Sequence, residues 1–146
     1  MKMPRGLRNN NPGNLRISAV AWLGKRAVSH ENEYETFIDM THGVRAMAIN
    51  AITAQSRHGC RTVRQLIQRW APQHENDTWA YVMRVAHAIG VDPDEPIELR
   101  DRKTLVAFVW AVAAHENGIR ACEKYLKRED VERGVDLALA AALGNA

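Results

Sequence analysis

The most apolar stretch of the chain constrains the fold more than any other feature. Residues 105–114 carry no charged side chain. Asp101 can cap a helix that runs from Leu105 to about His115, and Gly118 lies where a helix end favours a left-handed residue. Because such a helix is apolar on nearly every side, it needs neighbours all round it. It is also shorter than the roughly 18–20 residues of a membrane span. The sequence therefore predicts a buried central helix.

Other helices are predicted around this one from apolar spacing and capping residues. We expect helices from Thr41 to about Arg57, ending at Gly59; from Thr62 to just before Pro72; from a cap at Asp77 or Thr78 through Trp79 to Ile89; and from Glu129 to Leu143. Trp70, Trp79 and Trp110 fall in these helical patterns and are expected in the core. Residues 91–100 include two prolines, so they are expected to form a connecting loop.

The first 40 residues differ in composition from the rest. They are rich in Gly, Asn and Pro, and they alternate loosely in polarity from Trp22 to Phe37. This pattern is typical of a loop followed by a short hairpin or irregular ribbon. No helix alternates with strands along the chain, so the predicted class is α+β, mostly α. One domain over residues 1–146 would carry a small irregular N-terminal lobe.

The charge is moderately basic, with a net charge of +3 and a pI near 9.1. Nucleic acid and the anionic cell wall are both suitable partners for such a surface. Four arginines cluster around the helix that starts at Thr62, which resembles a helix-turn-helix: Arg57, Arg61, Arg64 and Arg69. Val63, Leu66, Ile67 and Trp70 take the core face of that helix and leave the arginines as an exposed rim. We therefore expect no nucleic-acid binding.

Several chemical classes have no support in the sequence. Cys60 and Cys122 are too few for a disulfide framework and are expected to be free thiols. No H-E-x-x-H pair or other ligand spacing predicts a metal. The serine-hydrolase elbow, the phosphate-binding loop and the dinucleotide fingerprint are also absent from the sequence. No cofactor is expected.

Glu116 is the strongest candidate for catalysis. It follows Leu105, Val109 and Val112 at intervals of 4, 3 and 4 residues, so its carboxylate continues a buried stripe. It also lies at a helix C-terminus, where the helix dipole disfavours negative charge. Both effects favour the protonated acid, which could protonate a glycosidic oxygen and then act as base. The alternative is an exposed Glu116 that pairs with Arg120, four residues on.

The opening segment, R-N-N-N-P-G-N-L-R at residues 8–16, resembles small phage and prophage proteins described as virion structural proteins or endolysins. The resemblance continues through Phe37 with G-V-R-A at residues 43–46, T-V at 62–63, R-W-A-P at 69–72, E-N-D-T at 75–78 with Tyr81-Val82, and H-E-N-G at 115–118. These pieces are also similar to those of goose-type lysozymes and soluble lytic transglycosylases, in a different chain order. A circular permutation of the lysozyme fold would reconcile the two orders.

This resemblance implies roles for several residues. The N-N-P-G-N-L-R segment, with Asn11, Asn14 and Arg16, would take the place of the glycan-binding loop, since amides suit sugar hydroxyls and N-acetyl groups. The alternative is a turn-rich loop with no ligand. Tyr81 would orient Glu116, although a tyrosine on such a helix is also a common core residue. Asn117 stands where the transglycosylases have Ser, and Trp22 is a candidate for stacking on a sugar ring.

The resulting expectation is a monomeric enzyme that cleaves the glycan strands of bacterial peptidoglycan, as a muramidase or a lytic transglycosylase. The alternative is an inactive virion or wall-binding protein of the same fold. Glu31, Glu33, Glu35 and Asp39 cannot be ranked as a second carboxylate, and the three glutamates alternate as a solvated face would. Without a visible export signal or membrane insertion, the protein would stay in the host cytoplasm until a holin-like pore opens, or travel with the virion.

Overall fold

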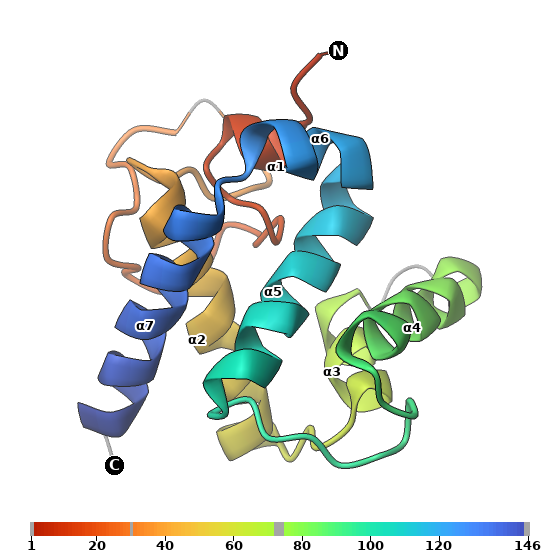
Figure 1. The fold of residues 1–146 in the computed structure, drawn as a ribbon. Helices are drawn as coiled ribbons and strands as arrows, with labels where there is room; N and C mark the ends of the chain where they lie inside the picture. Colours follow the sequence, from red (N-terminus) through yellow and green to blue (C-terminus); the bar gives the residue numbers. More distant parts are fainter. Residues whose placement is uncertain (1, 30, 72–74, 145–146) are drawn as a thin grey trace.

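The structure is a computed structural model that describes residues 2–29, 31–71 and 75–144, excepting the side chains of residues 75–77. The described residues form helices α1 (Arg5–Arg8), α2 (Met40–His58), α3 (Val63–Trp70), α4 (Glu75–Ile89), α5 (Arg102–Asn117), α6 (Ile119–Tyr125) and α7 (Arg128–Gly144) (Figure 1). Helix accounts for 61% of the chain and strand for 3%. The predicted mostly helical class is therefore confirmed.

Helix α5 runs through the centre of the molecule, with the other helices around it (Figure 1). It contacts α1, α2, α4, α6 and α7. Leu105, Phe108 and Val112 are fully buried along its length. Its N-terminus is capped by Asp101, whose side chain accepts a hydrogen bond from the Thr104 amide at 3.1 Å. The predicted central helix and its cap are confirmed.

Helices α2 and α7 pack closely against each other at one side of α5. A Cβ on Gly134 would lie 2.6 Å from the Cβ of Val44, so only glycine allows this approach. Helix α2 ends at Gly59 in the left-handed conformation (φ 68°), as expected. The predicted N-cap Thr41 is wrong. Asp39 takes that position because its carboxylate accepts the His42 amide at 2.9 Å.

Helices α3 and α4 form a second pair on the opposite side. Thr62 caps α3 in a reciprocal capping box with Gln65, which confirms the predicted start. Helix α4 begins at Glu75, earlier than the predicted caps Asp77 or Thr78. The Thr78 hydroxyl donates to the Ala71 carbonyl at 3.1 Å, and the side chain of Asp77 lies outside the described residues.

The tryptophans of this pair are not equally buried. Trp70 is partly buried and meets Phe108 edge to face, as expected for a core residue. Trp79 is 50% exposed and lies beneath the Arg64 guanidinium at 4.7 Å. The predicted core position of Trp79 is therefore wrong, because this turn of α4 faces outward.

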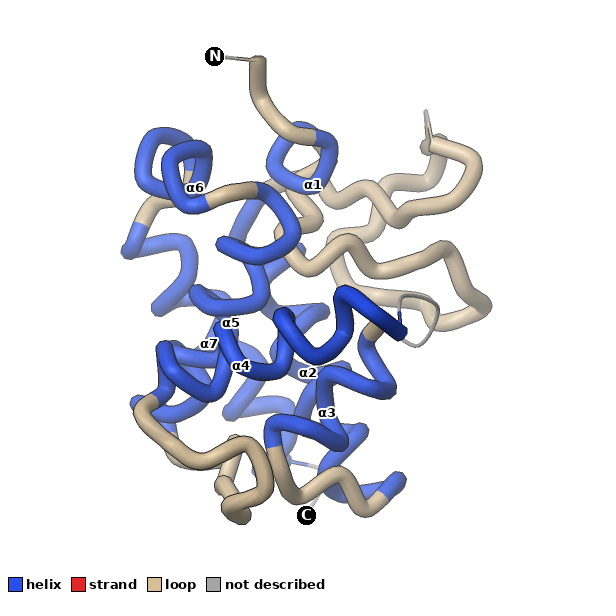
Figure 2. Tube along the Cα trace, turned by 90° about the vertical axis from the view of Figure 1, so that its right-hand side faces the viewer, coloured by secondary structure: helices blue, strands red, loops and turns tan. Residues whose placement is uncertain are grey.

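The N-terminal lobe is an irregular ribbon (Figure 2, tan). Isolated antiparallel bridges join Arg16 to Tyr34 and Lys25 to Phe37. They are supported by backbone hydrogen bonds such as the one from the Glu35 amide to the Leu15 carbonyl at 2.9 Å. This arrangement matches the predicted loop and short ribbon.

Helices α1 and α6 were not expected from the sequence. Helix α6 begins directly after Gly118, which adopts a positive φ of 92° and breaks the central helix. Both helices lie at the C-terminal end of α5 (Figure 1). Within the described residues, no helix combines the length and the apolar character that crossing a membrane requires.

Candidate active site

Glu116 lies one residue before the C-terminal end of α5, where the central helix meets the N-terminal lobe. Its side chain is partly buried. Both carboxylate oxygens accept a hydrogen bond: Asn14 Nδ2 donates to Oε1 at 2.9 Å, and the Tyr81 hydroxyl donates to Oε2 at 2.8 Å. No ion pair links it to Arg120, so the structure does not support the alternative of a surface pair.

The two donors come from distant parts of the chain. Asn14 is 102 residues and Tyr81 is 35 residues from Glu116 in sequence. Two donors on different oxygens fix the rotation of the carboxylate and leave each oxygen with a further lone pair. The site is thus built by the N-terminal loop, α4 and α5 together.

Tyr81 acts as a hydrogen-bond donor over a wide pH range. Its side chain is buried and stacks on the His115 ring, with centroids 3.7 Å apart and planes 22° apart. Burial, the charge of the neighbouring Glu116 and the hydrogen bond to it raise the pKa of Tyr81 well above 10. The phenol therefore remains protonated and pointed at the carboxylate.

Asn14 is held in an unusual backbone conformation. Its φ is +50°, in the left-handed region that Asn tolerates better than most residues. The backbone N–H of Asn14 donates to the backbone carbonyl of Asn11 at 3.0 Å, and this hydrogen bond closes a tight turn. This conformation, rather than the asparagine side chain alone, aims Nδ2 at Glu116.

Asn11 supports that turn from within. It is fully buried; Nδ2 donates to the carbonyls of Leu15 and Glu35, each at 3.0 Å, and Oδ1 accepts the Leu15 amide at 3.0 Å. No part of the side chain reaches the surface. The predicted contact between Asn11 and a sugar is therefore corrected: the residue holds the loop to the ribbon.

Asn117 also has a structural role. It is 8% exposed, and Nδ2 donates to the Pro12 carbonyl at 2.9 Å and the Ala113 carbonyl at 3.0 Å. Both amide protons are therefore used, one to tie the end of α5 to the loop and the other to bond a carbonyl of α5 itself. The predicted substrate contact of Asn117 is corrected for the same reason as that of Asn11.

A tryptophan fixes the loop to the helical core from the other side. Trp70 Nε1 donates to the Gly13 carbonyl at 3.0 Å. A Cβ on Gly13 would lie 3.0 Å from the Trp70 ring and 3.1 Å from Met47, so the loop is pressed against both α2 and α3. This packing places Asn14 at a fixed distance from α5.

Sequence reasoning missed Gly6 of α1. A Cβ at this position would lie 2.9 Å from Asn14 Oδ1 and closer still to Asn117 Oδ1. Only a glycine lets α1 pack on both asparagines. The signal available in the sequence was a glycine just upstream of the N-N-N-P-G-N segment, and it had no recognisable pattern.

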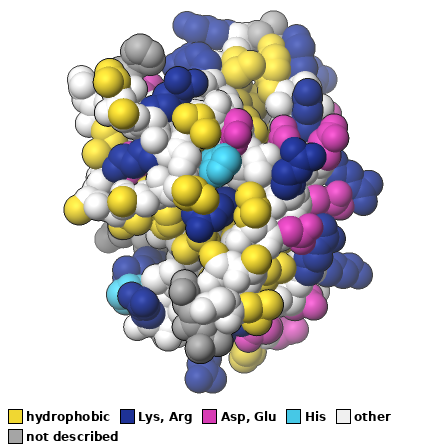
Figure 3. Space-filling view, turned by 90° about the vertical axis from the view of Figure 1, so that its left-hand side faces the viewer, with side chains coloured by type: hydrophobic (Ala, Val, Ile, Leu, Met, Phe, Trp, Pro, Cys, Tyr) yellow, Lys and Arg dark blue, Asp and Glu magenta, His cyan; other side chains and the backbone are white. Residues whose placement is uncertain are grey.

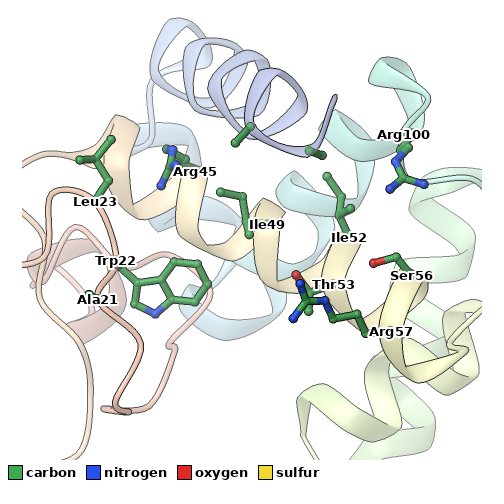
Figure 4. A pocket seen from close by; sticks show the side chains of 12 residues that line it. Ala21, Trp22, Leu23, Arg45, Ile49, Ile52, Thr53, Ser56, Arg57 and Arg100 are labelled. Carbon is green, nitrogen blue, oxygen red and sulfur yellow. The ribbon is translucent and has the colours of Figure 1, made fainter. Parts of the chain in front are cut away.

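Arg16 and Trp22, the two other predicted site residues, have no contact with Glu116 among those described. Arg16 is exposed, forms an ion pair with Glu33 at 3.6 Å, and lies over the Tyr34 ring at 5.2 Å. It is two residues from Asn14 in the sequence, and its contacts are with the ribbon of the N-terminal lobe. Trp22 lines a separate pocket between the N-terminal lobe and α2, and neither Asn14 nor Glu116 is among the residues that line it (Figure 4).

Three of the four predicted candidates for a second carboxylate have partners of their own. Glu35 is buried and pairs with Lys25 Nζ at 3.1 Å, so its assignment to a solvated face is wrong. Glu33 pairs with Arg16, and Asp39 caps α2. Within the described part of the chain, no group of three or more His, Cys, Asp or Glu side chains could hold a metal ion.

The chain is similar to a phage protein. No protein-family model matches the chain. Protein P5 of Pseudoalteromonas phage PM2 is 35% identical over 117 residues, an alignment that covers 78% of this chain and 71% of that protein.

Proposed function

We propose that this chain, which belongs to the same family as Protein P5 of Pseudoalteromonas phage PM2, cleaves the glycan strands of bacterial peptidoglycan with Glu116 as its general acid and base. One observation carries the proposal: a single carboxylate at the end of the central helix is held by one donor on each oxygen. The bacterial host of a phage supplies the substrate.

The hydrogen bonds suit proton transfer to a glycosidic oxygen. When the acid form of Glu116 gives up its proton, negative charge develops on the two carboxylate oxygens. Asn14 and Tyr81 already point at those oxygens, so they stabilise the charge without rearranging. Donors already oriented toward the developing charge are what an acid catalyst requires, which favours the enzyme over the inactive alternative.

Two product classes are compatible with one acid. Attack by the muramyl 6-hydroxyl on the anomeric carbon gives an anhydro sugar, and Glu116 as base takes the hydroxyl proton. Attack by water gives a reducing end. The first route needs no second carboxylate, whereas the second route needs one that activates the water.

We also propose that the fold is a circular permutation of the goose-type lysozyme and lytic transglycosylase fold. The contact between Tyr81 of α4 and Glu116 of α5 supports it, because those enzymes resemble this chain in both segments but carry them in the opposite order. On this proposal the protein acts in the periplasm, after release through a pore or delivery with the virion.

Digestion of purified peptidoglycan tests the proposed function. The protein is incubated with sacculi, and the soluble fragments are analysed by liquid chromatography and mass spectrometry. Disaccharide-peptide fragments are expected, with either anhydro or reducing muramic ends. Intact sacculi after prolonged incubation with folded protein would contradict the proposal.

A further inference from the structure

A groove separate from Glu116 lies between the N-terminal lobe, the outward face of α2 and the end of α7 (Figure 4). Its volume is about 520 Å³. Trp22 lies on one wall, Ile49 forms part of the floor, and three arginines surround the opening: Arg45, Arg57 and Arg100. We call this the basic groove.

The charge of the basic groove is unbalanced. No carboxylate lines it, and among the described residues none of its three arginines forms an ion pair. Arginines elsewhere, such as Arg64 with Asp94 and Arg102 with Asp136, do have carboxylate partners. Guanidinium groups bind phosphate through paired hydrogen bonds. The hydroxyls of Thr53 and Ser56 add donors to the same wall.

Exposed aliphatic side chains lie beside these cations. Val20 is 48% exposed and Leu23 is 58% exposed, on either side of Trp22 in the same loop. Leu143, which is 68% exposed, follows the groove residue Ala142 at the end of α7. On the face drawn in Figure 3, hydrophobic and cationic side chains are interspersed, and acidic side chains gather along one edge.

This combination favours one kind of partner. A small soluble anion would be satisfied by the arginines and has no use for exposed aliphatic side chains around them. At a lipid surface, cations meet the phosphates, tryptophan lies at the headgroup level and aliphatic side chains enter the acyl boundary. We propose that the basic groove docks the protein on an anionic phospholipid bilayer, with a headgroup phosphate bound by the arginines and Val20 and Leu23 inserted beside it.

Docking in this way would leave the Glu116 site accessible. Arg45 and Ile49 of α2 face the basic groove. Met47 lies two residues from each of them, which is about 200° around the helix, and it packs against Gly13 in the loop that carries Asn14. The two sites therefore lie on opposite faces of α2. The inference does not rest on peptidoglycan cleavage, and its test measures no enzymatic activity.

Vesicle co-sedimentation tests the arginines. The wild-type protein should bind vesicles of phosphatidylcholine with about 30% phosphatidylglycerol. It should bind pure phosphatidylcholine weakly, because the arginines contribute to binding only where the headgroups are anionic. Arg57→Gln and Arg100→Gln should each lower the partition coefficient about fivefold. Arg84→Gln makes the same charge change on α4, outside the groove, and should leave binding nearly unchanged. Equal losses in all three variants would overturn the proposal.

A second pair of variants separates a bilayer from a free phosphate. Leu23→Ser should weaken vesicle binding and reduce the blue shift of tryptophan fluorescence on adding vesicles. Ile119→Ser, at an equally exposed position on α6, should do neither. Inorganic phosphate is the probe for the alternative. If millimolar phosphate displaces the protein fully and Leu23→Ser has no effect, the groove binds a phosphate ion and the bilayer proposal is wrong. Circular dichroism checks that every variant is folded.

Discussion

Replacing Gly6 with alanine tests how closely α1 packs on the candidate site. Gly6 does not adopt a positive φ, so alanine is allowed by the backbone, and helix propensity alone would favour it by up to about 1 kcal/mol. The packing predicts the reverse. The new Cβ would lie 2.9 Å from Asn14 Oδ1, 3.0 Å from the Asn11 carbonyl and closer still to Asn117 Oδ1.

The cost follows from what has to move. A carbon needs roughly 3.5 Å from such neighbours, so the asparagine side chains must shift by about 0.5–1 Å. Asn117 is held by two hydrogen bonds and Asn14 donates to Glu116. Overpacking costs about 1–3 kcal/mol and each lost hydrogen bond about 1 kcal/mol, so we expect a net loss of about 2 kcal/mol in the free energy of unfolding.

Urea denaturation followed by circular dichroism measures this loss. Gly144→Ala is the matched control, because its Cβ would meet nothing within 4 Å and should change stability by a few tenths of a kcal/mol at most. The folded Gly6→Ala variant should also cleave peptidoglycan about tenfold more slowly, because Asn14 no longer reaches Glu116. A variant as stable and as active as the wild type would refute the described packing.

Tyr81→Phe should lower the rate of peptidoglycan cleavage about 10- to 100-fold in a dye-release assay, since Glu116 loses a donor, and a full rate would argue against a positioning role. Asn11→Ala should lower the free energy of unfolding by about 3 kcal/mol, measured in urea, because a fully buried side chain loses three hydrogen bonds; a loss under 1 kcal/mol would contradict the assigned role. Burial raises the pKa of the Cys122 thiol from 9.0 to about 11, so only the unfolded chain loses this proton as pH first passes 9. Stability should therefore fall by about 2 kcal/mol more between pH 9 and 11 in the wild type than in Cys122→Ala, and parallel curves would refute this.

The helices that could be predicted are those with their own local signals. The helix capped by Thr62 and the apolar helix capped by Asp101 each carry a capping residue and a clear buried face. Helices α1 and α6 lack both signals. No side chain caps them, and they are too short to show a periodic buried face. Their stability comes from tertiary packing at the end of α5, which periodicity does not reveal.

The start of α2 shows a different limit. Asp39 and Thr41 are both good capping residues, and the sequence gives no reason to prefer the first. The choice depends on backbone conformation: Asp39 is extended, whereas Thr41 already lies within the helix.

The candidate site could be predicted only in part. The position of Glu116 followed from helical spacing, and its partner Tyr81 followed from resemblance. The hydrogen bond from Asn14 was not predicted, because Asn14 was expected to contact a sugar. Asn11 and Asn117 were misassigned because an amide that suits a sugar suits a backbone carbonyl equally well. Burial separates the two roles, and burial of a loop residue depends on what packs over it.

The most direct test of the central claim is the rate at which Glu116→Gln releases soluble fragments from dye-labelled peptidoglycan. The amide is nearly isosteric and cannot donate a proton to a glycosidic oxygen, so the rate should fall to background. Thermal unfolding of the variant should stay within a few degrees of the wild type, which excludes loss of fold as the cause. Fragment release by the folded variant at the wild-type rate would contradict the assignment of Glu116 as the catalytic acid.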